Sequence, residues 1–311
     1  MLKGVIDKHE RSKLMKAGKR TSFGKVLALT LTLIFSVSLL AAVDMSYDVK
    51  LLGSSAPEVK VEAGAALKIP MLQGSGLLTS GNNLKVKGRV GVSPVSSTLS
   101  LEGVLTPLAV AEVSLGGTLG IGWDLTDSLK GLQFVSSAND PLVYESESVS
   151  GVYLKGKAGV ALQFDTAALF SSKWASVFAR VYQEVSYQSY TNVEAEDAWN
   201  FEMGGYKGDG WFYHGEYIVG YNMPIVLDKV ALMVETDINN FSDDMKTEVL
   251  ITLSPLLNFN VLKGLNITGL VQFTNKADFD KDSTKVEVAD SRILTGPLAF
   301  SKGVVMVTYS F

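Results

Sequence analysis

The chain has 311 residues, of which 47% are hydrophobic, and its formal net charge at pH 7 is −4. It contains no cysteine, which excludes a disulfide framework, a thiolate metal site and a lipid-modified N-terminal cysteine. The acidic balance argues against a nucleic acid partner, because binding a polyanion requires a concentration of cationic side chains.

The first 42 residues have the pattern of a cleavable export signal. Eight basic and two acidic residues fall in the first 25, and the uncharged run VLALTLTLIFSVSLLAA follows from Val26 to Ala42. A basic segment followed by an apolar segment and small residues is typical of a secretory signal peptide. A transmembrane anchor is the alternative, but the run is short for a membrane core of about 30 Å and contains four Ser or Thr residues. We expect a signal peptide at 1–42, cleaved near Ala42.

Removal of the leader makes the remaining chain, 43–311, more acidic. The whole chain has 28 Lys and Arg and 32 Asp and Glu; without the eight and two of the leader, 20 and 30 remain, a net charge near −10. We therefore expect no nucleic acid partner for this part. No stretch after Ala42 reaches 18 uninterrupted apolar residues, so we expect no transmembrane helix there.

Beyond Ala42, apolar residues alternate with polar or small ones. Between Ala111 and Trp123 every second position is apolar or glycine, and the positions between them carry Glu, Ser, Thr and Gly. The segments 58–69 and 152–165 repeat this pattern. Their length, their glycine-rich polar sides and aromatic residues near their ends favour membrane-crossing β-strands over a secreted sandwich or soluble barrel. The aromatic residues are Trp123, Phe164, Trp174, Tyr187, Tyr190, Trp211 and Tyr221.

The chain ends in the alternating stretch GVVMVTYSF, whose residues Val305, Val307, Tyr309 and Phe311 share one side of an extended strand. An export leader, no cysteine, amphipathic strands throughout and a terminal phenylalanine together resemble the bacterial outer-membrane β-barrel proteins, a porin-like class. The resemblance implies an all-β fold, a closed antiparallel transmembrane β-barrel in the bacterial outer membrane, surrounded by outer-membrane lipid. It also implies that these four residues form the signal read by the barrel-assembly machinery during insertion.

About twelve strands are expected, with ten to fourteen as the range. The candidates are 44–52, 58–69, 84–93, 98–106, 108–123, 148–165, 174–190, 211–223, 230–240, 247–254, 264–274 and 301–311. If both termini are periplasmic, the long connections 124–147, 191–210 and 275–300 fall outside, and the compact ones at Pro107, 166–173, 224–229 and 255–263 fall inside. The connection 70–83 is an exception, because it is long on the side of the short turns.

If the apolar sides face lipid, the polar sides line the lumen. The predicted pore-lining residues are Lys85, Lys87, Arg89, Glu102, Glu112, Lys155, Lys157, Arg180, Glu184 and Glu216. Charged walls tune the selectivity of a water-filled pore. The alternative is that these charges neutralise one another across a narrow barrel. The bases in LKVKGR and YLKGK slightly favour anionic solutes.

The sequence favours a pore for small hydrophilic solutes or ions, with no enzymatic activity; the oligomeric state stays open. A non-conducting structural or surface-interaction barrel is the alternative, in which Trp199, Phe201 and Tyr206 of the loop 191–210 fold into the barrel mouth or contact a partner. A lipid-modifying barrel enzyme is the third hypothesis. It depends on His214, the only histidine after the leader, and the sequence identifies no partner serine.

No cofactor and no metal are expected. The acidic run NKADFDKDSTKVEVAD has Asp278, Asp280 and Asp282 at the spacing of the first EF-hand ligands. Ser283 and Ala289, however, stand where that motif requires glycine and a bidentate glutamate. We therefore interpret the run as a solvated outer loop.

Overall fold

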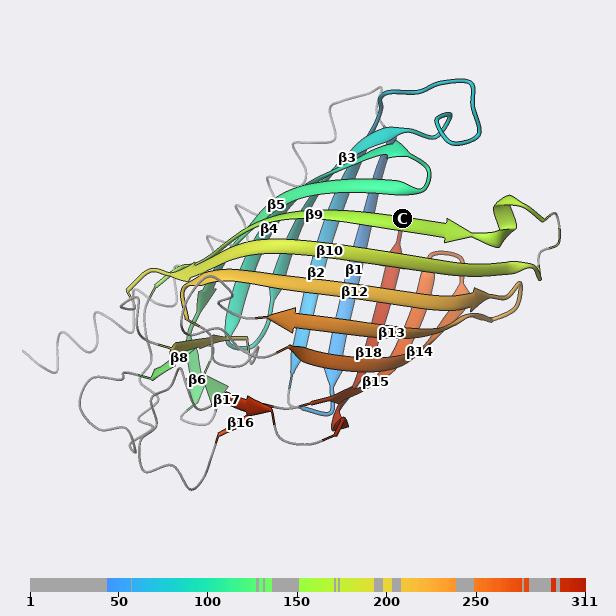
Figure 1. The fold of residues 1–311 in the computed structure, drawn as a ribbon. Coiled ribbons are helices and arrows are strands. Elements are labelled where there is room, and N and C mark those ends of the chain that lie inside the picture. Colours follow the sequence, from blue (N-terminus) through green and yellow to red (C-terminus); the bar gives the residue numbers. More distant parts are fainter. Residues whose placement is uncertain are drawn as a thin grey trace, which may run out of the picture. The chain divides into compact units, whose positions relative to one another are not determined.

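The structure is a computed structural model that describes residues 44–56, 58–126, 129–130, 132–135, 151–170, 172, 174–192, 198–202, 208–238, 249–275, 277–279, 292–294 and 297–311. Twelve long strands form a closed antiparallel barrel (Figure 1). In chain order they are β1 (Asp44–Ser54), β2 (Val59–Pro70), β3 (Asn83–Val92), β4 (Ser96–Leu108), β5 (Ala111–Gly122), β9 (Tyr153–Asp165), β10 (Ser176–Tyr190), β12 (Gly210–Asn222), β13 (Leu227–Ile238), β14 (Leu250–Leu262), β15 (Leu265–Thr274) and β18 (Ala299–Ser310). Each pairs with its neighbour in this order, and β18 pairs with β1 to close the ring.

The predicted fold class and the twelve predicted strands are confirmed, and each observed strand overlaps its candidate. The largest difference is in β14, which was expected to end at residue 254 and continues to Leu262. The residue after the expected end is Pro255, which cannot donate a backbone hydrogen bond to the ladder. Pro255 instead keeps its place in the ladder opposite Leu232, and the turn to β15 is only two residues long, at 263–264. The prediction of a compact connection over 255–263 is thereby corrected.

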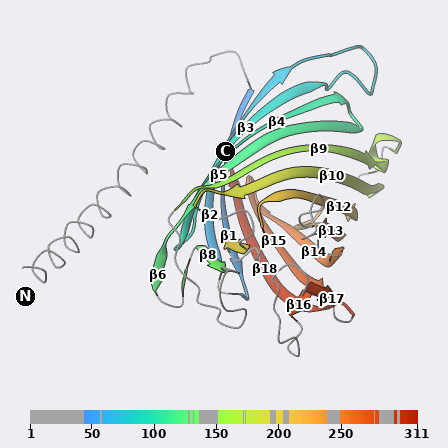
Figure 2. The same cartoon turned by 60° about the vertical axis from the view of Figure 1, so that its left-hand side comes forward.

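The long connections contain short strands. Among the described residues these are β6 (Asp124–Thr126), β7 (Leu129–Lys130), β8 (Leu132–Val135), β11 (Ala198–Phe201), β16 (Ala277–Phe279) and β17 (Arg292–Leu294), which pair as β6 with β7, β8 with β11 and β16 with β17. They gather at one end of the barrel, here named the long-loop end (Figures 1 and 2). The other end, named the terminal end, holds the start of β1 and the end of β18, together with the short 3₁₀ helix η2 (Thr166–Ala168). No helix in the described part of the chain is long and apolar enough to cross a membrane.

The outer wall of the barrel is apolar. Large side chains at alternate positions stay exposed on it, among them Leu101 (62%), Leu115 (70%) and Leu162 (63%). Their neighbours along the chain point inward, where polar side chains gather. A soluble protein buries such an apolar surface, whereas a membrane barrel presents it to lipid.

Most of the predicted aromatic residues lie where a membrane interface would place them. At the long-loop end, Tyr187 and Trp211 are exposed and pack edge to face at 5.4 Å between ring centroids. At the terminal end, Phe164 and Trp174 are exposed. The expectation was wrong for Tyr190, which is only 2% exposed, because its even position in β10 directs it inward.

The connection 70–83, the exception in the predicted topology, is held at the terminal end by hydrogen bonds. The buried Asn82 donates from Nδ2 to the backbone oxygens of Leu72 and Pro107, at 2.8 and 2.5 Å. The amide of Ala109, in the β4–β5 turn, donates to Leu78 O at 2.8 Å. This long connection therefore packs on its neighbouring turn, and its length does not change the strand order.

Candidate functional site

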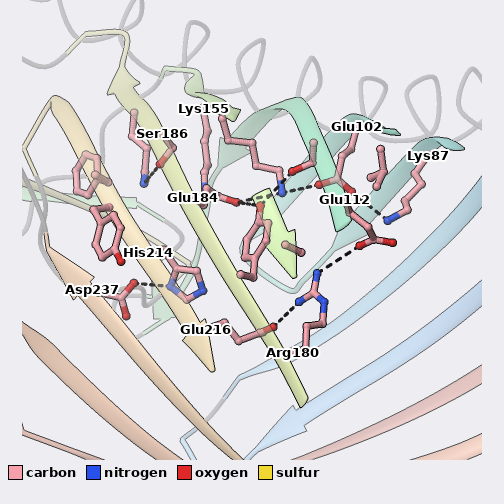
Figure 3. Close-up of a pocket in the computed structure, with 18 residues that line it drawn as sticks. Lys87, Glu102, Glu112, Lys155, Arg180, Glu184, Ser186, His214, Glu216 and Asp237 are labelled. Carbon is pink, nitrogen blue, oxygen red and sulfur yellow. Dashed lines mark hydrogen bonds and ion pairs between the residues drawn. The ribbon is translucent and has the colours of Figure 1, made fainter. Parts of the chain in front are cut away.

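The barrel interior holds a cavity of about 430 Å³ surrounded by charged side chains (Figure 3). They come from β3, β4, β5, β9, β10, β12 and β13, because the period of two along each strand directs every second residue inward. The charged lining residues are Lys87, Glu102, Glu112, Lys155, Lys157, Arg180, Glu184, Glu216 and Asp237, with His214 among them. The cavity is therefore suited to polar solutes and water.

Three lysines and two glutamates form a continuous chain of ion pairs, named here the lysine ladder: Lys87, Glu102, Lys157, Glu184 and Lys155. Glu102 lies 3.3 Å from Lys87 Nζ and 2.8 Å from Lys157 Nζ. Glu184 lies 3.3 Å from Lys157 Nζ and 2.7 Å from Lys155 Nζ. Since three cations share two carboxylates, the ladder carries one excess positive charge.

The register of the strands builds this ladder. Lys87 of β3 is directly opposite Glu102 of β4, and Glu102 is opposite Gly116 of β5, which in turn is opposite Lys157 of β9. A Cβ at Gly116 would lie 3.2 Å from the Cβ of Glu102. The missing side chain therefore lets Lys157 reach across β5 to Glu102.

A second charged group surrounds Arg180 of β10. Its guanidinium lies 2.6 Å from Glu216 and 3.7 Å from Glu112, and it also lies over the ring of Tyr182, 5.2 Å from the centroid. In this group a single cation, Arg180, is shared by the carboxylates of Glu112 and Glu216. The acidic excess of this group opposes the basic excess of the ladder, so the lumen has no large net charge at this level.

His214 is oriented by a carboxylate. Its Nδ1 lies 2.7 Å from Asp237 Oδ1, on the neighbouring strand β13. Both side chains point into the cavity, as Figure 3 shows. The lipid-facing side of β12 carries Trp211, Tyr217 and Val219 instead, so the His214 imidazole faces away from the outer wall.

A second cavity of about 320 Å³ lies around Arg89. Arg89 lies 3.0 Å from Asp48 and 3.2 Å from Glu62. The cavity is also lined by Phe201 and Glu202, which belong to the long connection between β10 and β12. This connection therefore reaches the barrel interior.

Glu202 binds the inner wall of the barrel from that connection. Its carboxylate lies 2.9 Å from Lys60 Nζ and accepts a hydrogen bond of 2.6 Å from Ser96 Oγ. Glu202 has a φ of 53°, a left-handed conformation that non-glycine residues adopt at a cost. Its two charge-assisted contacts offset that cost.

An aromatic cluster holds the same connection in the barrel mouth. Phe201 stacks on Tyr153 at 4.6 Å, and Trp199, only 1% exposed, packs edge to face on the same ring at 5.7 Å. Trp199 Nε1 donates to Asp209 Oδ1 at 2.8 Å, and burial raises the pKa of the Asp209 carboxyl. The structure thus places Trp199 and Phe201 in the mouth, as one of the two expectations had it; Tyr206 lies outside the described residues.

Nine of the ten predicted pore-lining residues lie on one of the two cavities. Lys87, Glu102, Glu112, Lys155, Lys157, Arg180, Glu184 and Glu216 line the larger cavity, and Arg89 lines the smaller one. Lys85 lines neither. Sequence reasoning missed Glu202, because nothing in an acidic connection indicates which carboxylate turns inward. It also missed Asp48 and Lys60 as partners, although their even positions in β1 and β2 were a usable signal.

The predicted assembly signal lies on the outer wall of β18. Val305, Tyr309 and Phe311 are exposed, and Val307 shares their side of the strand. Phe311 stacks on Tyr47 of β1 at 5.8 Å, and the two residues exchange backbone hydrogen bonds of 3.2 and 3.1 Å. The last residue of the chain therefore belongs to the seam that closes the barrel.

Among the described residues, no group of three or more His, Asp or Glu side chains is placed to hold a metal ion. Residue 276 and residues 280–290 of the acidic run considered for calcium lie outside the described residues.

The closed twelve-strand barrel with its apolar outer wall confirms, at the level of the fold, the expected resemblance to porin-like outer-membrane β-barrels. No family model matches the chain, and no curated protein matches it. Among solved structures, the chain is similar to the NanC porin (7% identity, 86% of this chain and 99% of that chain, TM-score 0.38) and the KdgM porin (11%, 86% and 99%, TM-score 0.37). OmpT of Vibrio cholerae is a further similar structure (5%, 87% and 99%, TM-score 0.35).

Proposed function

We propose that the chain is an exported outer-membrane barrel that works as a pore for small hydrophilic solutes or ions. The observation that carries the proposal is the accessibility of the charged lumen. The side chains of Lys87 and Asp237 keep 44% and 39% of their surface exposed beside the 430 Å³ cavity, although Lys87 is ion-paired with Glu102 and Asp237 is hydrogen-bonded to His214. A plugged barrel would bury such groups, whereas a water-filled lumen keeps them hydrated.

The proposed passage is narrow at the long-loop end. Trp199, Phe201 and Glu202 occupy part of the mouth, and Phe201 and Glu202 line the smaller cavity there. A constriction built this way favours small solutes over polymers. The opposed excess charges of the lysine ladder and of the Arg180 group predict weak selectivity between simple cations and anions.

The location and the assembly route belong to the same proposal. An apolar outer wall requires a lipid environment, and the basic and apolar segment 1–42 supplies an export signal. In this proposal Val305, Val307, Tyr309 and Phe311 present the assembly signal, because they form the outer face of the strand that closes the barrel.

A non-conducting barrel is the second candidate function. It is favoured by the closed pairing within the lysine ladder, since paired charges stabilise a filled interior. In that case the connections at the long-loop end carry the activity by contacting a partner.

An enzymatic function is the weakest of the three. A lipid-cleaving site on the barrel must face the bilayer, and His214 faces the lumen beside Asp237. The purified protein and its His214→Ala variant are expected to show the same background rate of lipid hydrolysis. Loss of a measurable hydrolase activity in this variant would restore the enzymatic hypothesis.

Single-channel recording decides between pore and closed barrel. Residues 43–311, refolded in detergent and inserted into a planar bilayer, are expected to give stable current steps and a reversal potential close to zero in a salt gradient. A folded barrel that inserts without any current step would contradict the pore and favour the interaction function.

A further inference from the structure

One wall of the lumen carries no charge among its inward-facing residues. On β14 and β15 the inward positions alternate with exposed outer residues such as Ile251, Leu257 and Val271. The inward residues are Leu250, Thr252, Ser254, Leu256, Asn258 and Asn260 on β14, and Asn266, Thr268, Leu270, Gln272 and Thr274 on β15. The inward residues of this wall are thus uncharged, whereas every residue of the lysine ladder is charged.

An apolar strip crosses the middle of this wall and extends onto the neighbouring strands β13 and β18; it is made of Ala231, Met233, Leu256, Leu270, Val304 and Met306. The inner faces of β13 and β18 also carry Lys229, Glu235, Asp237 and Lys302. Leu256 is directly opposite Ala231 on one side and Leu270 on the other, and Leu270 is opposite Val304. Met233 follows Ala231 by two residues on the inner face of β13, and Met306 follows Val304 by two residues on the inner face of β18. All except the buried Ala231 are partly exposed, and the alternation along their strands directs them inward, although none of the six lines either of the two cavities described above.

The strip lies across the lumen from the lysine ladder. In a ring of twelve strands, β14 is six strands from β4 in either direction, and by the same count β13 faces β3, β15 faces β5 and β18 faces β9. The strand that carries Leu256, β14, thus faces the strand that carries Glu102 with its lysine partners, β4. The centre of the lumen has one apolar side and one side with excess positive charge.

We propose that the lumen selects amphipathic organic anions, solutes with a short alkyl or aromatic body and one anionic head group. This inference rests on the proposed pore function and names its substrate class. When the apolar body of the solute covers the strip, both surfaces leave water, and each fully buried CH₂ contributes about 0.8 kcal/mol of favourable binding free energy. The head group meets the excess positive charge of the ladder. On the strands of the strip, Lys302 is paired with Glu58 and Lys229 lies over the ring of Phe178, 5.1 Å from its centroid, whereas Glu235 repels an anion and so orients the head toward the ladder.

The test measures how long such solutes stay in the lumen. Single channels formed by residues 43–311 are exposed to a series of linear alkanesulfonates from ethane- to octanesulfonate, and the duration of each current blockade is recorded. We expect the blockade to lengthen about two- to fourfold for each added CH₂. A matched series of alkylammonium ions is expected to give shorter blockades at every chain length.

Two sets of variants separate the two sides of the lumen. The double variant Leu256→Ser with Leu270→Ser is expected to abolish the dependence on chain length. Leu257→Ser, the same change on the outer side of β14, is its matched control and is expected to keep that dependence. Lys87→Gln and Lys157→Gln are expected to shorten all alkanesulfonate blockades by a similar factor, because the head group is the same throughout the series.

The outcomes distinguish this inference from the proposed function. Stable current with blockades independent of chain length overturns the apolar strip as a binding surface while the pore stands. Stable current with longer blockades by alkylammonium ions overturns the anionic head group. Absence of any current overturns the pore itself and this inference with it. To show that each variant has folded, its barrel must stay intact in detergent as long as the sample is not heated.

Discussion

The carboxylate of Glu202 lies 2.9 Å from the ammonium group of Lys60, 142 residues earlier in the chain. Glu202 belongs to a connection at the long-loop end and Lys60 to the inner face of β2, so this ion pair ties the connection to the far wall of the mouth. Ser96 adds a hydrogen bond to the same carboxylate.

Removing this tie is expected to loosen the mouth. Glu202→Gln weakens both contacts, and the connection should lose about 1–2 kcal/mol of stabilisation, as expected for a charge-assisted hydrogen bond. Single channels of the variant should show larger or noisier current than the unaltered protein. Glu58→Gln is the control, because Glu58 pairs with Lys302 on the barrel wall and not with the connection. Equal current and noise in both variants would contradict a constriction at Glu202.

Reversing charge in the lumen is expected to change ion preference. Lys87→Glu combined with Lys155→Glu turns the excess charge of the lysine ladder from positive to negative, so the reversal potential in a salt gradient should move toward that of a cation-selective pore. The measurement is made in a planar bilayer. Lys263→Glu, the same change in the exposed turn between β14 and β15, should have little effect. If the control and the double variant shift the potential equally, the ladder does not line the conduction path.

The terminal aromatic residue is expected to matter more for assembly than for stability. Phe311 is 68% exposed and contacts Tyr47, so Phe311→Ala should cost only about 1 kcal/mol of barrel stability in detergent. If Phe311 presents the assembly signal, the amount of folded protein in cell membranes should fall several-fold. Phe300→Ala is the control, since Phe300 is comparably exposed at the other end of β18. Equal loss of folded protein in both variants would leave Phe311 without a special role.

The pH dependence of the mouth follows from Asp209. Burial raises the pKa of this carboxyl above its ordinary value of 3.8, so folding favours the protonated form. The contribution of Asp209 to stability is therefore complete below pH 3.8 and is lost as the pH rises through the raised pKa. Asp209→Asn keeps an acceptor for Trp199 and should make the docking of the connection independent of pH in that range. Fluorescence of Trp199, with the other tryptophans replaced by phenylalanine, reports the docking of the connection. If the Asp209→Asn variant kept the pH profile of the unaltered protein, Asp209 would not be the group that makes the docking depend on pH.

The sequence was sufficient to predict the barrel because the alternation of apolar and polar residues marks the long strands and an antiparallel barrel requires an even number of them. Alternation such as that from Ala111 to Trp123 determines which side of a strand meets lipid, and the even strand number follows from closure. The end of β14 was not predicted correctly, since Pro255 stays within the strand although proline is rare in the interior of a sheet.

The lumen was only partly predictable. Inward residues such as Lys87 and Glu102 follow from alternation, but their pairing depends on the register between strands, which the sequence does not specify. Glu202 was not predictable at all, since its position depends on the stacking of Phe201 on Tyr153. The apolar strip was hidden for a similar reason: Leu256 and Leu270 look like ordinary strand residues until the ring order places them opposite the charged wall.

The seam between β1 and β18 also has a kinetic meaning. It joins Asp48 to Ser310 and Ser54 to Val304, so its contacts link the first and the last strand of the domain. Contacts between residues so distant in sequence form slowly, because the whole intervening chain must be ordered first. The seam therefore cannot form before β18 has been synthesised, and until then both edges of the unfinished sheet are open to pairing with other chains. The sheet needs protection in the interval between synthesis and closure, and that interval ends only when β18 has paired with β1.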